Sequence, residues 1–214
     1  MAEKQIIIKN VRCMYSNLKE PYAPKGKNEG KPKYSLSILI PKKEKALVKQ
    51  IMDYMTETVK DSSHTPGVKQ LMLSTAKNTD PANKYCFMRD GDKLNEHNEL
   101  LGKAKISAYA NSWVLNLKRP VSFGRALIVN EKNEKISPEF LDAEIQSGYW
   151  VNAIATPHPY KGEATSFSLT LQQVQRVKAD ESLNTMESMF EPLEDVAVEE
   201  STGDSPFNDD DIPL

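Results

Sequence analysis

Two aspartates separated by a glycine are the residues whose spacing most directly suggests catalysis. Asp90 and Asp92 stand in the stretch RDGD, and two carboxylates can hold Mg²⁺ in a metal-dependent enzyme that processes DNA. Asp-Gly pairs more commonly form turns whose side chains bond to the backbone. The sequence places no third acidic ligand and no nucleophile with a base nearby. We therefore expect a turn at residues 89–92, no catalytic residue and no cofactor.

Cysteine and histidine are too few and too scattered for a metal site or a disulfide framework. Cys13 and Cys86 lie far apart, and His64, His97 and His158 stand in loop-like surroundings without matching partners. The first ten residues contain an apolar run of only three, and no stretch approaches the length of a membrane span. We expect no metal, no membrane association and a reduced, cytoplasmic setting.

Basic and acidic residues are divided between two parts of the chain. Residues 180–214 contain 12 acidic residues and no Lys or Arg, so they carry a net charge of −12. Residues 1–179 hold all 28 Lys and Arg against 18 of the 30 acidic residues, a net charge of +10. A basic body indicates a polyanionic partner, and an acidic stretch without periodicity is typical of disorder. We therefore predict a nucleic-acid-binding domain at 1–179 and a disordered acidic tail at 180–214.

Basic and aromatic residues that could bind a nucleic acid occur together in several stretches. In GKAKISAYANS, Lys103, Lys105 and Tyr109 alternate with small apolar residues, which predicts a strand with one face for phosphates and bases. Trp113 shares their parity, and Trp150 alternates against Val151 and Ala153, although either tryptophan could instead belong to the core. Further candidates are Tyr22, in a loop that could instead be disordered, and Lys33, which faces away from the core side of its strand. Arg89 could instead pair with the neighbouring aspartates, and Lys118 and Arg119 could be plain surface charges.

The elements that must position these residues are mostly short strands. Alternation predicts strands over residues 5–12, 33–40, 102–112, 126–129, 149–155 and 166–177. An apolar stripe from Leu47 to Val59 predicts one helix, Thr65 and Pro66 begin a second, and residues 16–32 read as a loop. No regular alternation of strands with helices indicates a parallel sheet. The best fit is a mainly β fold, a five-stranded antiparallel barrel with inserted helices.

The acidic tail ends in three apolar residues, Ile212, Pro213 and Leu214, which a segment that only keeps the protein solvated does not need. We expect the tail to lie on the basic body when nucleic acid is absent and to bind partner proteins once it is displaced. The predicted partner-binding residues are Phe207, Asp209, Asp210, Asp211, Ile212, Pro213 and Leu214.

Four stretches resemble a family of phage single-stranded DNA-binding proteins: KPKYSLSILIPK, FMRDGDKLNEH, LKRP and SGYWVNAIATPHPY with SFSLTLQQVQRV. That family is akin to the helix-destabilising replication proteins of lytic phages and has an OB-fold with an acidic C-terminal tail. The ending NDDDIPL is also similar to the acidic tip of bacterial single-stranded DNA-binding proteins, which usually ends in Ile-Pro-Phe. Leu214 departs from that pattern and would fill a pocket made for Phe less well.

The resemblance, which covers about residues 5–178 and the tip, implies a non-catalytic protein. Such a protein would coat single-stranded DNA, protect it, and recruit replication or recombination proteins through its tail. Two alternatives stay open, a metal-dependent DNA-processing enzyme and an adaptor that acts through its acidic tail alone. The sequence also leaves the oligomeric state open, a homodimer included.

Overall fold

The computed structural model describes residues 5–23, 31–80, 87–160 and 166–180 of the chain. All of them belong to one compact unit. Cys86 and the predicted partner-binding residues from Phe207 to Leu214 lie outside the described residues. Within the described parts, no helix has the length and apolar composition needed to cross a bilayer.

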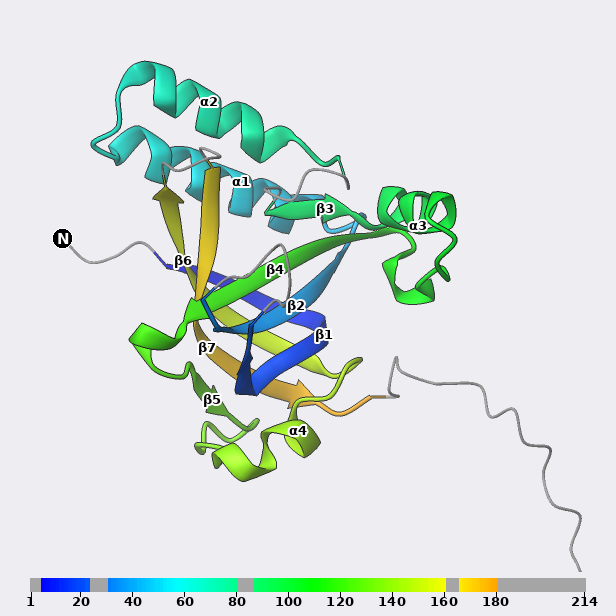
Figure 1. Ribbon diagram of the computed structural model, residues 1–214. Helices are drawn as coiled ribbons and strands as arrows, with labels where there is room; N and C mark the ends of the chain where they lie inside the picture. The colour runs from blue at the N-terminus through cyan, green and yellow to red at the C-terminus, as the bar shows by residue number, and fades with distance from the viewer. Residues whose placement is uncertain (1–4, 24–30, 81–86, 161–165, 181–214) are drawn as a thin grey trace, which may run out of the picture. The chain divides into compact units, whose positions relative to one another are not determined.

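Seven strands form one curved sheet in the described residues, and helices pack around it (Figure 1). The strands are β1 (Ile6–Tyr22), β2 (Lys33–Pro41), β3 (Met88–Asp90), β4 (Ser112–Pro120), β5 (Leu127–Val129), β6 (Trp150–Tyr160) and β7 (Ser166–Lys178). The helices are α1 (Lys45–Asp61), α2 (Pro66–Lys77), α3 (Gly91–Leu100) and α4 (Leu141–Glu144), with 3₁₀ turns at Ser107–Tyr109, Val121–Phe123 and Pro138–Phe140.

Five of the strands close into a barrel. The sheet runs β3-β4-β2-β1-β6-β7-β5, and an additional pairing of β4 with β7 joins its two sides. A closed five-stranded barrel with inserted helices is an OB-fold, so the predicted mainly β fold is confirmed. One detail differs from the expectation of an antiparallel barrel. The pair of strands that closes the barrel, β4 and β7, is parallel, and Leu117 lies beside Leu169 in it.

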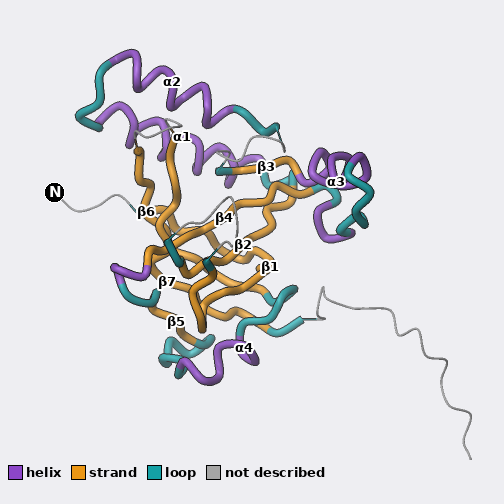
Figure 2. The backbone as a smooth tube through the Cα atoms, in the orientation of Figure 1, coloured by secondary structure: helices purple, strands orange, loops and turns teal. Residues whose placement is uncertain are grey.

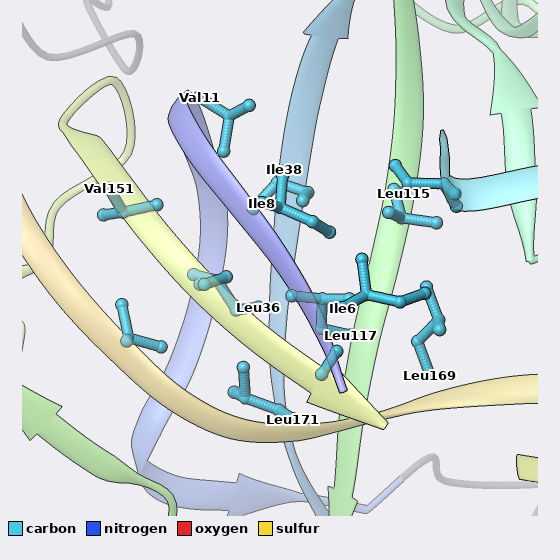
Figure 3. Close-up of a cluster of buried hydrophobic side chains, with 14 of the residues drawn as sticks. Ile6, Ile8, Val11, Leu36, Ile38, Leu115, Leu117, Val151, Leu169 and Leu171 are labelled. Atoms are coloured by element: carbon cyan, nitrogen blue, oxygen red, sulfur yellow. The ribbon is translucent and has the colours of Figure 1, made fainter. Parts of the chain in front are cut away.

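The barrel interior is filled by aliphatic side chains from all five strands (Figure 3). On β2, Leu36, Ile38 and Ile40 are fully buried, as their alternation predicts. Leu115 and Leu117 of β4 lie opposite Ile38 and Leu36, so neighbouring strands supply matching layers of the core. This interdigitation fixes the register, because a slip by one residue would turn the polar faces inward.

Helices α1 and α2 form an antiparallel hairpin against β6, β7 and the start of β1 (Figure 2). The predicted apolar stripe of α1 is confirmed, since Ile51, Met55 and Val59 are buried against the barrel. Pro66 stands in the first turn of α2, where its missing N–H costs no helical hydrogen bond. The side chain of Thr65 precedes it but makes no capping bond.

Strand β1 is much longer than the predicted strand at residues 5–12. It continues to Tyr22, so the first part of the predicted loop at 16–32 is strand. Asn10 and Tyr15 have positive φ angles of 54° and 48°, and the pairing register shifts beside both. These irregularities interrupt the period-two pattern by which a strand is recognised.

Residues 102–112 do not form the predicted strand. They pass through the 3₁₀ turn Ser107–Tyr109, and the backbone N–H and C=O of Ile106 bond to the side chain of Asn95 at 2.9 and 3.0 Å. A helix side chain thereby takes the place of a partner strand. The predicted turn at residues 89–92 is also wrong, because Asp90 ends β3 and caps α3 by accepting from the N–H groups of Asp92 and Lys93.

Candidate nucleic-acid interface

The outward face of β1, β2 and β4 is polar over half its length. Residues 33, 35 and 37 of β2 alternate with the core residues and therefore point away from the barrel. The Ser37 hydroxyl donates to Asn116 Oδ1 at 2.7 Å, and Asn17 donates to the Ser35 hydroxyl at 3.1 Å. These bonds join three strands through uncharged side chains. We call this surface, residues 17, 33, 35, 37, 116 and 118, the polar face.

Three cations gather at the polar face. Lys33 and Lys118 are exposed, and Arg89 of β3 lies close enough to act on Lys118 electrostatically. Loss of water to the surrounding protein lowers the pKa of Lys118, although its side chain is exposed, and the charges of Lys33 and Arg89 lower it further. The Arg89 Nε is shielded from solvent and has no hydrogen-bond partner in the described part of the chain. None of the three has an ion-pair partner among the described residues.

An exposed tyrosine stands on the neighbouring strand β1. The Tyr15 side chain is 46% exposed, and its backbone has the left-handed conformation that residues with a side chain rarely adopt. Its N–H donates to the Ser147 hydroxyl at 3.2 Å, which holds this backbone in place. Its side chain lies close enough to that of buried Tyr109 to act on its pKa. Burial, and then the contact with Tyr15, raises the pKa of Tyr109 to about 12, so Tyr109 remains a neutral phenol.

At the other end of the face, Trp150 is surrounded by charged side chains. Arg12 and Lys178 lie 5.5 and 5.2 Å from the centre of its ring, both within cation–π range. The Trp150 Nε1 and Arg12 Nη2 both donate to one carboxylate oxygen of Asp180, at 2.6 and 2.8 Å. Asp180 is the first residue of the predicted tail, and it is bound to the barrel.

The three residues predicted to share one DNA-contacting strand face do not come together. Tyr109 is buried in a small second core beneath α3, where it packs with Met14, Leu39 and Val114. Lys105 forms an ion pair with Glu99 at 2.9 Å, and Lys103 is exposed in the loop after α3. The alternation in this stretch reflects packing against a helix and not a sheet.

The remaining predicted residues divide into accessible and structural ones. Tyr22 is 60% exposed and lies opposite Lys33 in the β1–β2 register. Arg119 donates to the carbonyl oxygens of Phe123, Gly124 and Leu171, and so ties β4 to the turn that follows it and to β7. Trp113 is half-buried against the main core.

Asp90 and Asp92 are held by a lysine. The Lys42 Nζ donates to Asp90 at 2.6 Å and to Asp92 at 2.7 Å, and it lies 5.3 Å from the ring centre of Trp113. Partial burial opposes the charge on Lys42, but these bonds outweigh it and raise the Lys42 pKa. The bond from Lys42, and then the N–H of Asn111, lowers the pKa of Asp92. The two carboxylates therefore fasten α3 to the ends of β2 and β4, and no cluster of three potential metal ligands occurs in the described residues.

Sequence reasoning missed Tyr15 and Arg12. Tyr15 lay beyond the predicted end of the first strand, and Arg12 was its last residue, so neither was assigned to a face. The apolar residues Cys13, Met14 and Leu18, all buried, continue past residue 12 and could have indicated a longer strand.

Comparison with known proteins gives a consistent result. The family model described as Enterobacter phage Enc34, ssDNA-binding protein, matches residues 4–202. The solved structure of the single-stranded DNA-binding protein from bacteriophage Enc34 in complex with ssDNA is 25% identical, with a TM-score of 0.56. That match covers 83% of this chain and 88% of the other. A second structure of the Enc34 protein has the same identity and TM-score and covers 87% of each chain.

The single-stranded DNA-binding protein gp2.5 encoded by bacteriophage T7 is similar in fold. It is 16% identical, with a TM-score of 0.55, over 90% of this chain and 100% of the other. No curated protein matches the chain.

Proposed function

Because the chain belongs to the family of the Enterobacter phage Enc34 ssDNA-binding protein, we propose that it coats single-stranded DNA during phage DNA replication or recombination. It acts in the host cytoplasm, without catalysing a reaction on the DNA. The Enc34 protein, 25% identical to this chain, was solved in complex with ssDNA, which supports the same ligand here.

One observation in the structure carries the proposal: three cations without a described counter-ion stand on the polar face, and the neighbouring strand β1 carries exposed tyrosines. Desolvation, and then the charges of Lys33 and Arg89, lowers the pKa of Lys118, and a phosphate backbone would offset the effect of these neighbouring charges. In OB-folds the face of the second and third barrel strands and the adjoining loops bind oligonucleotides, and β2 and β4 have that place here.

The contacts that we propose combine phosphate binding with base stacking. Lys33, Lys118 and Arg89 bind phosphates, while Tyr15 and Tyr22 offer exposed rings on which bases can stack. Arg119, Tyr109 and Trp113 support this surface from within the fold. Because neither phosphates nor ring stacking encodes sequence, we expect little sequence preference.

The function is tested by titrating the full-length protein with labelled oligo-dT and with a duplex of equal length, at two salt concentrations. We expect tight binding selective for the single strand, with a log–log salt slope of about −0.7 for each phosphate neutralised. Failure to bind the single strand, even without the tail, would refute the proposal and favour the adaptor. Cleavage of the oligonucleotide that requires Mg²⁺ would favour the DNA-processing enzyme.

We further propose that the acidic tail, residues 180–214, competes with DNA for the body and recruits partner proteins when it is displaced. The opposite net charges of the two parts support this proposal. The bond of Asp180 to Arg12 and Trp150 supports it too, since the acidic stretch starts at one end of the DNA-contacting side. The change from a basic to an acidic stretch therefore lies between residues 179 and 180. Asp180 itself is bound to the barrel.

Truncation after Asp180 tests the competition and keeps the Arg12–Asp180 bond. We expect the truncated protein to bind oligo-dT several-fold more tightly at low salt, with a smaller gain at high salt, where the Debye length falls to about 3 Å at 1 M. A full-length variant with every Asp and Glu of 181–214 changed to Asn or Gln separates charge from bulk and should match the truncation. Equal affinities with and without the tail would rule the competition out.

A further inference from the structure

An exposed phenylalanine stands in the turn that follows β4. Phe123 is 59% exposed and belongs to neither of the hydrophobic clusters formed by the described residues. The rest of the turn, residues 121–125, is exposed as well, so packing gives no reason for an aromatic side chain there. In Figure 1 the turn projects beyond the end of β4. The proposed phosphate and stacking contacts do not use it.

The backbone that carries Phe123 is held in place by Arg119. The Arg119 Nη2 donates to the carbonyl oxygen of Phe123 at 2.7 Å, and its Nε donates to that of Gly124 at 2.9 Å. Gly124 has φ 68° and ψ −176°, a conformation that is essentially restricted to glycine. The Arg119 guanidinium also lies 5.9 Å from the centre of the Phe123 ring, within cation–π range. A ring that is already positioned loses little conformational freedom when a ligand covers it.

The charge around the turn favours a polyanion as the ligand. Arg119 bonds to carbonyl oxygens and to the side-chain amide of Gln172, and Arg125 donates to the carbonyl oxygen of Lys19 at 2.7 Å. These acceptors are neutral, and neither arginine has an ion-pair partner among the described residues. Both positive charges are therefore uncompensated beside an exposed ring, the combination with which proteins bind single-stranded nucleic acid.

A second exposed phenylalanine lies in surroundings of the opposite charge. Phe140 is 58% exposed in the 3₁₀ turn Pro138–Phe140, and its exposed neighbour Glu139 is acidic. A phosphate backbone would be repelled there. Of these two similar turns, only the one with Phe123 combines a ring with a basic setting.

The turn with Phe123 continues from one end of the polar face. Tyr22 lies opposite Lys33, and Lys33 lies opposite Pro120, the last residue of β4. Phe123 follows Pro120 by three residues, which span at most about 11 Å. An OB-fold binds about 4–16 nucleotides, so one strand is long enough to contact the polar face and this turn together.

We infer that Phe123 is a further base-stacking residue, and that the bound strand leaves the polar face past Lys33 and over residues 121–124. The inference rests on the proposed function and gives the strand a path at this end of the barrel. Arg119 is a positioning residue, because it holds the turn that presents the ring. Since every base has a face that can stack, the contact adds affinity without demanding a sequence.

Removing the ring tests the contact without changing any charge. Phe123→Ala is compared with Phe140→Ala, the matched control at an equally exposed phenylalanine in another 3₁₀ turn. Each variant is titrated with oligo-dT and with an abasic strand that has the same number of phosphates. We expect Phe123→Ala to weaken the binding of oligo-dT about tenfold, with an unchanged salt slope and with wild-type affinity for the abasic strand. Phe140→Ala should bind both oligonucleotides like the wild type.

Two further variants separate stacking from a general apolar contact. Phe123→Tyr keeps a ring and should keep the affinity, whereas Phe123→Leu keeps apolar bulk and should lose it. Because position 123 is exposed, all of these variants should melt like the wild type, which separates binding from folding. An equal loss on both oligonucleotides, no loss for Phe123→Ala, or full affinity of Phe123→Leu would overturn the stacking of Phe123 while leaving the proposed function intact. If the wild type does not bind oligo-dT, the proposed function itself fails.

Discussion

Changing both Lys33 and Lys118 to glutamine is expected to weaken the binding of single-stranded DNA at low salt by at least an order of magnitude. Both side chains are exposed on the polar face and have no ion-pair partner among the described residues, so each is available to a phosphate. A hydrogen bond to a charged group contributes about 1.5–3 kcal/mol, and 1.4 kcal/mol corresponds to tenfold in affinity. The log–log salt slope should become shallower by about 1.4, since each phosphate contact contributes about 0.7.

The matched control changes the charge of the protein equally at another place. Lys60→Gln with Lys69→Gln alters the turn end of the α1–α2 hairpin (Figure 1) and should leave both affinity and slope nearly unchanged. Thermal unfolding separates binding from folding. Because Lys33 lowers the pKa of Lys118, the double glutamine variant removes a repulsion and should melt no lower than the wild type. An unchanged salt slope would show that DNA does not contact these lysines.

Leu117→Ala is expected to reduce the free energy of unfolding by about 2–5 kcal/mol, the range for a buried leucine that leaves a cavity. Leu117 is fully buried and lies between Leu36 of β2 and Leu169 of β7 (Figure 3). It therefore joins the antiparallel part of the barrel to its parallel closure, and its loss removes contacts on both sides. Urea unfolding followed by circular dichroism measures the change, with an unchanged dependence on denaturant if the transition stays two-state.

Leu100→Ala provides the comparison for this measurement. Leu100 has the same side chain, but it is 85% exposed at the end of α3, so its removal should change stability by less than about 0.5 kcal/mol. A Leu117→Ala variant that loses less than this would mean that the closure of β4 on β7 contributes little to the fold.

Period-two patterns were sufficient where a strand has one buried and one exposed face. In β2 the core residues Leu36, Ile38 and Ile40 recur at every second position, and both the strand and its inner face could be predicted. The same pattern misled at residues 102–112, because the partner of Ile106 is the side chain of Asn95 on α3. Nothing in the local spacing distinguishes a strand partner from a helix side chain that supplies the same two hydrogen bonds.

The same alternation made part of the polar face predictable. Lys33 follows from the alternation of β2, and Lys118 lies opposite Ser35 on the neighbouring strand. Arg119, the next residue, looks equivalent in sequence. Its guanidinium, however, donates hydrogen bonds to backbone carbonyls of the turn after β4 and of β7. Those acceptors come together only when the barrel closes, so composition and spacing do not reveal them.

The order in which the barrel strands are synthesised has a consequence for the newborn chain. Ile8 pairs with Ala153, about 145 residues later, and at about 5–20 residues per second the ribosome needs roughly 7 to 30 s to make that partner. Until β4 has been made, β1 and β2 can pair only with each other, and a two-stranded hairpin is marginally stable in water. After β4 has paired with β2, the edge of β1 that faces β6 in the barrel still stays open to other chains. We expect the nascent protein to depend on chaperones, or on slow production, until β6 and β7 emerge from the exit tunnel.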